Sequence, residues 1–107
     1  MTPDERYAEL ARAFLGQPEV SQEGRGFGSS ALKVRGRIFA MLSSRGEFVV
    51  KLPRQRVDQL VAAGEGDRYD PGKGRLMKEW LAVKAGDQRD WLPLAEEALA
   101  FVGSAPQ

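Results

Sequence analysis

The chain has 107 residues and a formal net charge of +1; 42% of its residues are hydrophobic and 29% are charged. This length suits a single domain over 1–107, and the composition is typical of a folded globular protein. The chain has no Cys and no His, which excludes disulfides, thiolate nucleophiles, histidine bases and Cys/His metal sites. We therefore expect no metal and no cofactor.

The first residues and the apolar stretches predict a cytoplasmic protein with no membrane partner. The sequence reads Met1, Thr2, Pro3, Asp4 and Glu5 at its start, without the basic and apolar regions of a signal peptide. Its longest mostly apolar stretch, 92–102, is shorter than the roughly 20 residues that a membrane crossing needs.

The first predicted element is a helix that begins at Pro3. Thr2 and Glu5 have the spacing of a capping box, and Gly16 followed by Pro18 predicts the end of the helix. The apolar stripe of this helix consists of Tyr7, Leu10, Ala11, Phe14 and Leu15.

The middle of the chain is typical of an antiparallel meander. A glycine-rich connector, 24–30, separates a first short strand from the rest, and Arg35-Gly36 and Ser44-Arg45-Gly46 are predicted turns. The predicted strands cover about 19–22, 31–34, 37–43 and 47–52. One unbroken strand over 31–42 is the alternative, and it would place Lys33, Arg35 and Arg37 on a single face.

A second helix is predicted from Pro53 to Gly64, and 64–75 is predicted to be a long loop because it is rich in Gly, Asp and Pro. A further strand follows over 76–84.

The last helix is predicted from Asp90, as the N-cap, to about Val102, with Pro93 in its first turn. Its apolar arc is wider than one sheet contact requires, so the helix lies in a groove between elements or makes a dimer contact. The folded core is expected over about 3–102, with a frayed tail at 103–107.

Together these elements predict a single α+β domain. We expect an antiparallel sheet of about 4–5 strands with helices packed on one side, in the order α-β-β-β-β-α-β-α. Nothing in the spacing indicates a catalytic pair of carboxylates or a serine–lysine pair on a helix.

Positive charge is concentrated in residues 24–56, which hold eight basic residues and one acidic residue. Such a segregated charge can attract phosphate groups even when the net charge is small. The candidate nucleic-acid-binding residues are Arg25, Lys33, Arg35, Arg37, Arg45, Lys51, Arg54 and Arg56. In the alternative interpretation these side chains face water or pair with acidic groups of the same molecule.

Trp80 lies between Lys78 and Lys84 on one face of a predicted strand. A tryptophan beside lysines can stack on an unpaired base, although such a side chain also packs under a helix with the lysine stems over it. A candidate interaction surface therefore comprises Lys78, Trp80, Lys84, Trp91 and Phe101.

Several motifs resemble the MmcQ/YjbR-like family of short bacterial proteins. These motifs are GFG at 26–28, LKVRGRIFA at 32–40, VVKLP at 49–53 and WLAV at 80–83. Phe27-Gly28 and the helix with Trp91, Leu94, Ala95 and Ala98 also resemble the N-terminal domain of TfoX-type competence regulators. The chain departs from the family pattern at Arg37, where a lysine is usual, and in the glycine-rich segment 64–74.

The resemblance implies a frataxin-like or double-wing fold, a DNA-binding role and no catalytic residues. We therefore expect a small non-enzymatic protein that binds DNA weakly through phosphate contacts. The alternatives are a protein–protein adaptor or homodimer that uses the last helix, and a small-ligand enzyme with an acidic cleft.

Overall fold

The computed structural model describes residues 2–23, 31–72, 74, 76–84 and 90–104. The predicted connector 24–30, with Arg25, lies outside these residues, as does the end of the predicted tail, 105–107.

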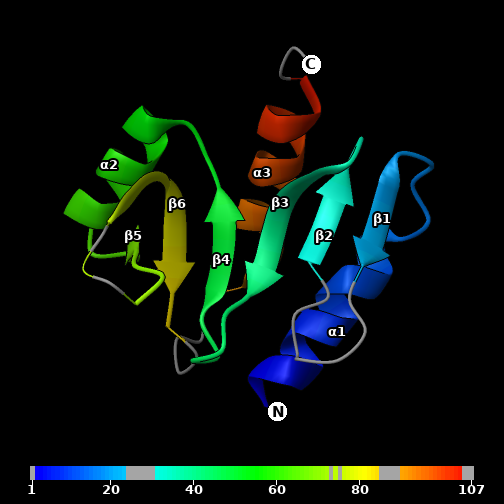
Figure 1. The fold of residues 1–107 in the computed structure, drawn as a ribbon, viewed down its shortest axis with the longest axis horizontal. Helices are drawn as coiled ribbons and strands as arrows, with labels where there is room; N and C mark the ends of the chain where they lie inside the picture. The colour runs from blue at the N-terminus through cyan, green and yellow to red at the C-terminus, as the bar shows by residue number, and fades with distance from the viewer. Residues whose placement is uncertain (1, 24–30, 73, 75, 85–89, 105–107) are drawn as a thin grey trace.

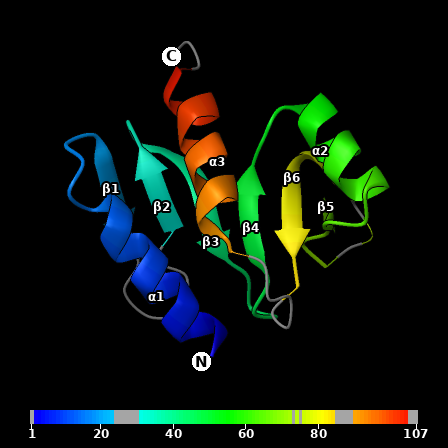
Figure 2. The ribbon, with the colours of Figure 1, turned by 180° about the vertical axis from the view of Figure 1, so that it is seen from behind.

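The chain forms one α+β domain in which helices cover a six-stranded antiparallel sheet (Figures 1 and 2). The strand order is β1-β2-β3-β4-β6-β5. The elements are α1 (Pro3–Phe14), β1 (Val20–Glu23), β2 (Ala31–Val34), β3 (Arg37–Leu42), β4 (Phe48–Lys51), α2 (Arg54–Ala62), β5 (Asp67–Tyr69), β6 (Met77–Val83) and α3 (Leu92–Ser104). The α+β class and the antiparallel sheet are confirmed, and the sheet is larger than predicted.

The additional strand is β5, which lies within the predicted loop 64–75. It pairs with β6, and an ion pair from Arg68 to Asp58 joins it to α2. Gly66 precedes it where a Cβ atom would lie 2.9 Å from Leu81 Cδ1 and 3.0 Å from the Ala82 carbonyl oxygen. The absence of a side chain at Gly66 therefore lets the chain approach β6.

Helix α1 has the predicted capping box. The Thr2 hydroxyl accepts a hydrogen bond from the Glu5 amide, and the Glu5 carboxylate accepts one from the Thr2 amide. This backbone hydrogen bond lowers the pKa of Glu5. Tyr7, Leu10, Ala11 and Phe14 are buried as predicted, whereas Leu15 is exposed because it follows the last helical turn.

The β2–β3 connection is a tight hairpin turn, and the alternative of an unbroken strand over 31–42 is wrong. Arg35 and Gly36 have φ values of 53° and 80°. Positive φ at both central residues is the geometry whose twist matches that of antiparallel strands. The Arg35 side chain pairs with Glu19, which precedes β1.

A β-bulge lies in β3 directly after this turn. Leu32 is opposite Ala40 and Lys33 is opposite Ile38, so Phe39 is an extra residue in β3. Phe39 and Ala40 are both completely buried in the core. The bulge therefore changes which residues of β3 can pair with its neighbours.

Helix α3 lies against β3, β4 and β2, between α1 and α2, and in front of the sheet in Figure 2. Ala95, Ala98 and Val102 are buried against the sheet, and Leu92, Leu94, Leu99 and Phe101 pack partly against the same core. Packing within this chain thus accounts for much of the apolar arc, as the groove alternative predicts. In the part of the chain that the structure describes, no helix combines the length and the apolar character that crossing a membrane would require.

Candidate nucleic-acid interface

The pairing between β3 and β4 ends near the bulge. β3 pairs with β4 only from Ala40–Val50 to Leu42–Phe48. Beyond Ala40, Arg37 and Ile38 pair with β2, and Lys51 pairs with Trp80 of β6. The two strands diverge at this end, where α3 passes behind them (Figure 1).

A cleft of about 600 Å³ lies at this divergence. Its cationic side chains come from three neighbouring strands: Lys33 from β2, Arg37 from β3 and Lys51 from β4. The remaining lining residues are Gly36, Ile38, Glu79, Trp80, Phe101 and Val102. The cleft thus combines three cations and one carboxylate with two aromatic rings, which suits an anionic group attached to a flat apolar one.

Trp80 is partly exposed, and the Lys51 Nζ atom lies 5.4 Å from the centroid of its ring. A second hollow of about 460 Å³ lies next to the cleft and shares Lys51, Glu79 and Trp80 with it. Leu76 and Met77, which are 57% and 37% exposed, line this second hollow together with Lys78. Trp80 therefore borders both hollows.

Three of the predicted phosphate-binding arginines are paired with carboxylates of the same chain. Arg35 Nε is 3.0 Å from Glu19 Oε2, and this hydrogen bond raises the pKa of Arg35. Arg56 donates to both oxygens of Glu97, at 2.8 and 3.1 Å, which raises the pKa of Arg56.

Arg45 is the third of these arginines. Its Nε atom lies 3.0 Å from Glu47 Oε1, and its guanidinium also donates to the carbonyl oxygen of Asp70. This side chain joins the β3–β4 turn to the segment after β5, at the end of β4 away from Lys51. It therefore lies away from the cleft.

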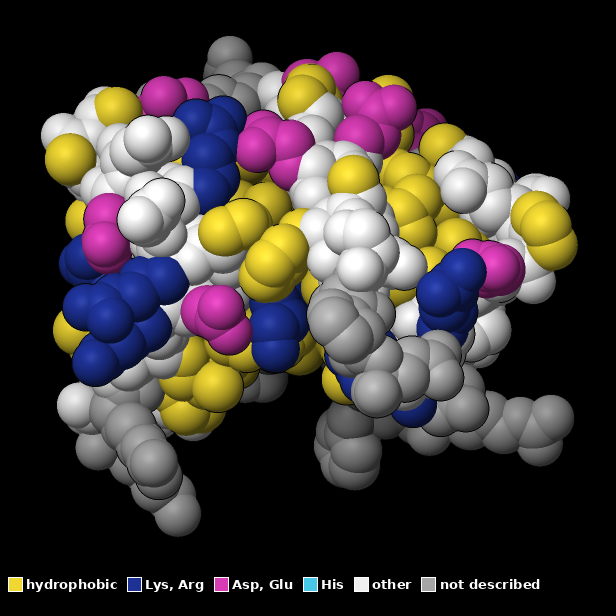
Figure 3. Space-filling model, turned by 90° about the horizontal axis from the view of Figure 1, so that it is seen from above, with side chains coloured by type: hydrophobic (Ala, Val, Ile, Leu, Met, Phe, Trp, Pro, Cys, Tyr) yellow, Lys and Arg dark blue, Asp and Glu magenta, His cyan; other side chains and the backbone are white. Residues whose placement is uncertain are grey.

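On the face shown in Figure 3, the described basic residues do not form one continuous surface. Seen from above, Lys and Arg side chains stand in separate groups, with acidic side chains beside several of them and hydrophobic side chains between them (Figure 3). Among the described residues, Arg37 and Arg54 form no ion pair. Arg54 is exposed in the first turn of α2 but does not line the cleft. The structure brings together Lys33, Arg37 and Lys51 from the predicted set.

The second predicted surface is also divided. Trp91 is only 2% exposed, because its ring lies between the Arg6 guanidinium, 3.9 Å from its centroid, and the Phe48 ring, stacked at 4.7 Å. Trp91 therefore belongs to the core and cannot form part of a partner surface. Phe101 lines the cleft with Trp80 and Lys78 lines the second hollow, whereas Lys84 follows the Phe48–Val83 pair at the far end of β4 from Lys51.

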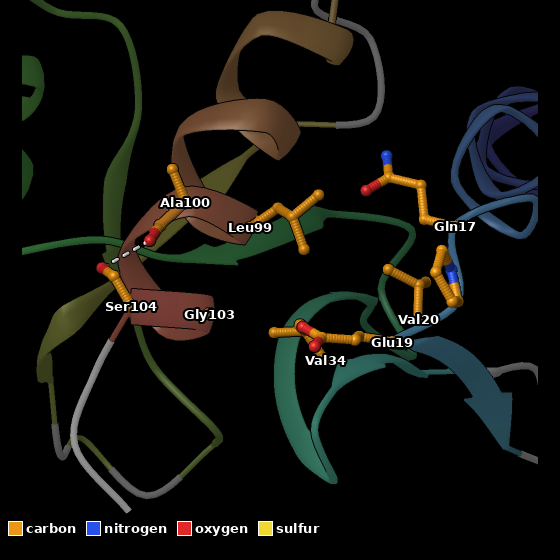
Figure 4. Close-up of a pocket in the computed structure, with 9 residues that line it drawn as sticks. Gln17, Glu19, Val20, Val34, Leu99, Ala100, Gly103 and Ser104 are labelled. Carbon is orange, nitrogen blue, oxygen red and sulfur yellow. Dashed lines mark hydrogen bonds between the residues drawn. The ribbon is translucent and has the colours of Figure 1, made fainter.

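A third hollow, of about 410 Å³, lies between the start of β1, the end of β2 and α3 (Figure 4). Val20, Val34 and Leu99 point into it, and the Ser104 hydroxyl donates to the Ala100 carbonyl oxygen at 2.7 Å. No Lys or Arg is among its described lining residues, and its one carboxylate, Glu19, pairs with Arg35. This groove is therefore unsuited to phosphate.

Compared with protein-family models, with curated proteins and with solved structures, the chain matches none of them. The described residues also contain no group of three or more Asp or Glu side chains arranged to hold a metal ion.

Proposed function

We propose that this protein binds nucleic acid in the cleft between β3 and β4. The observation that carries the proposal is the convergence of Lys33, Arg37 and Lys51, from three strands, on one cleft that also contains Trp80. Ammonium and guanidinium groups bind phosphate oxygens and release the counterions of the nucleic-acid backbone. The paired arginines contribute little, because phosphate would have to displace a carboxylate already in place.

Fluorescence anisotropy with a labelled DNA oligonucleotide tests this proposal at about 50 mM and about 200 mM NaCl. We expect affinity to fall steeply with salt. In the triple variant Lys33→Gln, Arg37→Gln, Lys51→Gln, affinity should fall further and the slope of log K against log salt should flatten by about 0.7–0.9 for each lost phosphate contact.

Arg35→Gln is the matched control, because it removes a positive charge from the same hairpin but from a side chain paired with Glu19. Its affinity should stay close to that of the parent protein. Absence of binding at low salt, or an equal loss in the control and triple variants, would contradict a phosphate site in the cleft.

The motifs that resemble MmcQ/YjbR-like and TfoX-type proteins are compatible with this function. A non-enzymatic role and a cytoplasmic location stay predictions, as does the alternative of an adaptor or homodimer acting through the last helix. Light scattering at micromolar concentration measures the homodimer directly.

A further inference from the structure

We propose that the ligand is a single strand, and that its unpaired bases stack on Trp80. This inference rests on the proposed function and names the form of nucleic acid that the cleft accepts. It starts from the position of the indole, which borders two hollows instead of lying on a flat basic face.

The two hollows have volumes of about 600 and 460 Å³, within the range of clefts that hold small organic groups. Each provides apolar contact beside a cation: Phe101 with Arg37 in one, and Leu76 with Lys78 in the other. A strand that crosses Trp80 would place one nucleotide in each hollow. Lys51, which lines both, would bind the phosphate between them.

A duplex fits this arrangement poorly. Its bases are paired and stacked inside the helix, so the indole could reach them only after unstacking, which costs a few kcal/mol per step in protein–DNA complexes. In a single strand the faces of the bases are accessible, and aromatic side chains stack on them with little dependence on sequence. The cleft therefore favours the strand whose bases are already exposed.

The charge of the ligand makes this inference testable. A duplex has the higher charge density, so a site that recognised only phosphate would bind duplex more tightly than a single strand. We expect the reverse order here: oligo(dT) of about twelve nucleotides should bind more tightly than a duplex hairpin with the same number of phosphates at equal salt.

Intrinsic fluorescence provides the second measurement. Trp80 is partly exposed and Trp91 is 2% exposed, so stacking of oligo(dT) should quench the emission of Trp80 and leave that of Trp91 as a constant background. Trp80→Phe should retain most of the binding but lose the quenching. Trp80→Leu should weaken oligo(dT) binding roughly tenfold, and should weaken duplex binding less than that.

The outcomes separate the two proposals. If neither oligonucleotide binds at low salt, the proposed function fails and this inference fails with it. If duplex binds as tightly as oligo(dT), or if oligo(dT) binds without quenching Trp80, the cleft recognises phosphate alone and stacking is excluded. If Trp80→Leu does not fold, the quenching in the parent protein and its loss in Trp80→Phe still decide the question.

Discussion

Tyr7 joins the first helix to the middle of the sheet. Its side chain is 4% exposed, its hydroxyl donates to the Ala40 carbonyl oxygen at 3.3 Å, and its ring centroid lies 6.3 Å from that of Phe48. Burial raises the pKa of Tyr7, because the phenolate would lose its hydration in the core.

Tyr7→Phe should lower the free energy of unfolding by about 1 kcal/mol below pH 9, because one buried hydrogen bond is lost. Above about pH 10 the unfolded chain releases the Tyr7 proton while the folded chain keeps it, so the parent protein loses stability as pH rises. The variant lacks this loss, and the difference between the two proteins should shrink. Urea unfolding at several pH values measures it.

Tyr69→Phe serves as the control, because it leaves Tyr7 in place and should keep the loss of stability that Tyr7 causes at alkaline pH. If the free energies of unfolding of Tyr7→Phe and the parent differ by the same amount at pH 8 and at pH 11, that result would contradict a raised pKa of Tyr7 in the folded protein.

Single residues also show where reasoning from the sequence succeeds and where it does not. The capping box of Thr2 and Glu5 could be predicted because both partners lie within one helical turn. The pairing of Arg56 with Glu97, 41 residues away, could not. The burial of Trp91 could not be predicted either, because the residues next to it in the sequence do not indicate that Arg6 and Phe48 enclose its ring.

At the scale of elements, the β2–β3 turn depends on left-handed backbone at Arg35 and Gly36. A Cβ atom at Gly36 would meet no other atom within 4 Å, so only backbone conformation opposes a side chain there. Gly36→Ala should lower the free energy of unfolding by about 1–2 kcal/mol.

Gly16→Ala is the matched control for this effect. Gly16 also has open space around it, but its φ is not in the positive range. The control should leave stability unchanged or raise it by about 0.4–1 kcal/mol, because it restricts the unfolded chain. Urea unfolding of both variants measures the comparison, and equal losses would show that the positive φ at Gly36 does not cause the effect.

The strands beside the Arg35-Gly36 turn and the strand β5 differ in how well the sequence predicts them. In β2 apolar residues flank Lys33, and β3 is a short apolar run after Arg37, so both strands can be identified locally. β5 has three residues, Asp67–Tyr69, in a segment rich in Gly and Asp, and it is a strand only because it pairs with β6. A pairing of this kind depends on the rest of the fold.

At the scale of the whole molecule, one hydrophobic cluster joins the three helices to five of the strands. Phe48 lies within it and contacts the rings of both Tyr7 and Trp91, from α1 and from the start of α3. Because no separate core exists among the described residues, the molecule should unfold as one unit.

Urea unfolding followed by tryptophan fluorescence and by far-ultraviolet circular dichroism should therefore give the same midpoint. Trp91 reports on the core and Trp80 on the strands at the cleft, so the combined emission covers both parts of the molecule. Two separate midpoints would show that the molecule does not unfold as one unit.

The fold class could be predicted because apolar periodicity and turn residues are local signals. The cleft could not, since it depends on which residues of β3 lie opposite β2 and β4. The charge of residues 24–56 can be counted from the sequence, but the count does not show that Lys33, Arg37 and Lys51 line one cleft while Arg35 and Arg56 pair with carboxylates elsewhere.

The insertion of Phe39 has a consequence for any related chain. Residues directly opposite each other in two strands point to the same face, so a sequence without Phe39 would keep Ile38 opposite Lys33 but bring it next to Ala40, where it could continue the pairing of β3 with β4. The cleft between β3 and β4 would then close, even if every lysine and arginine were kept. The proposed site therefore depends on this extra residue as well as on the basic side chains.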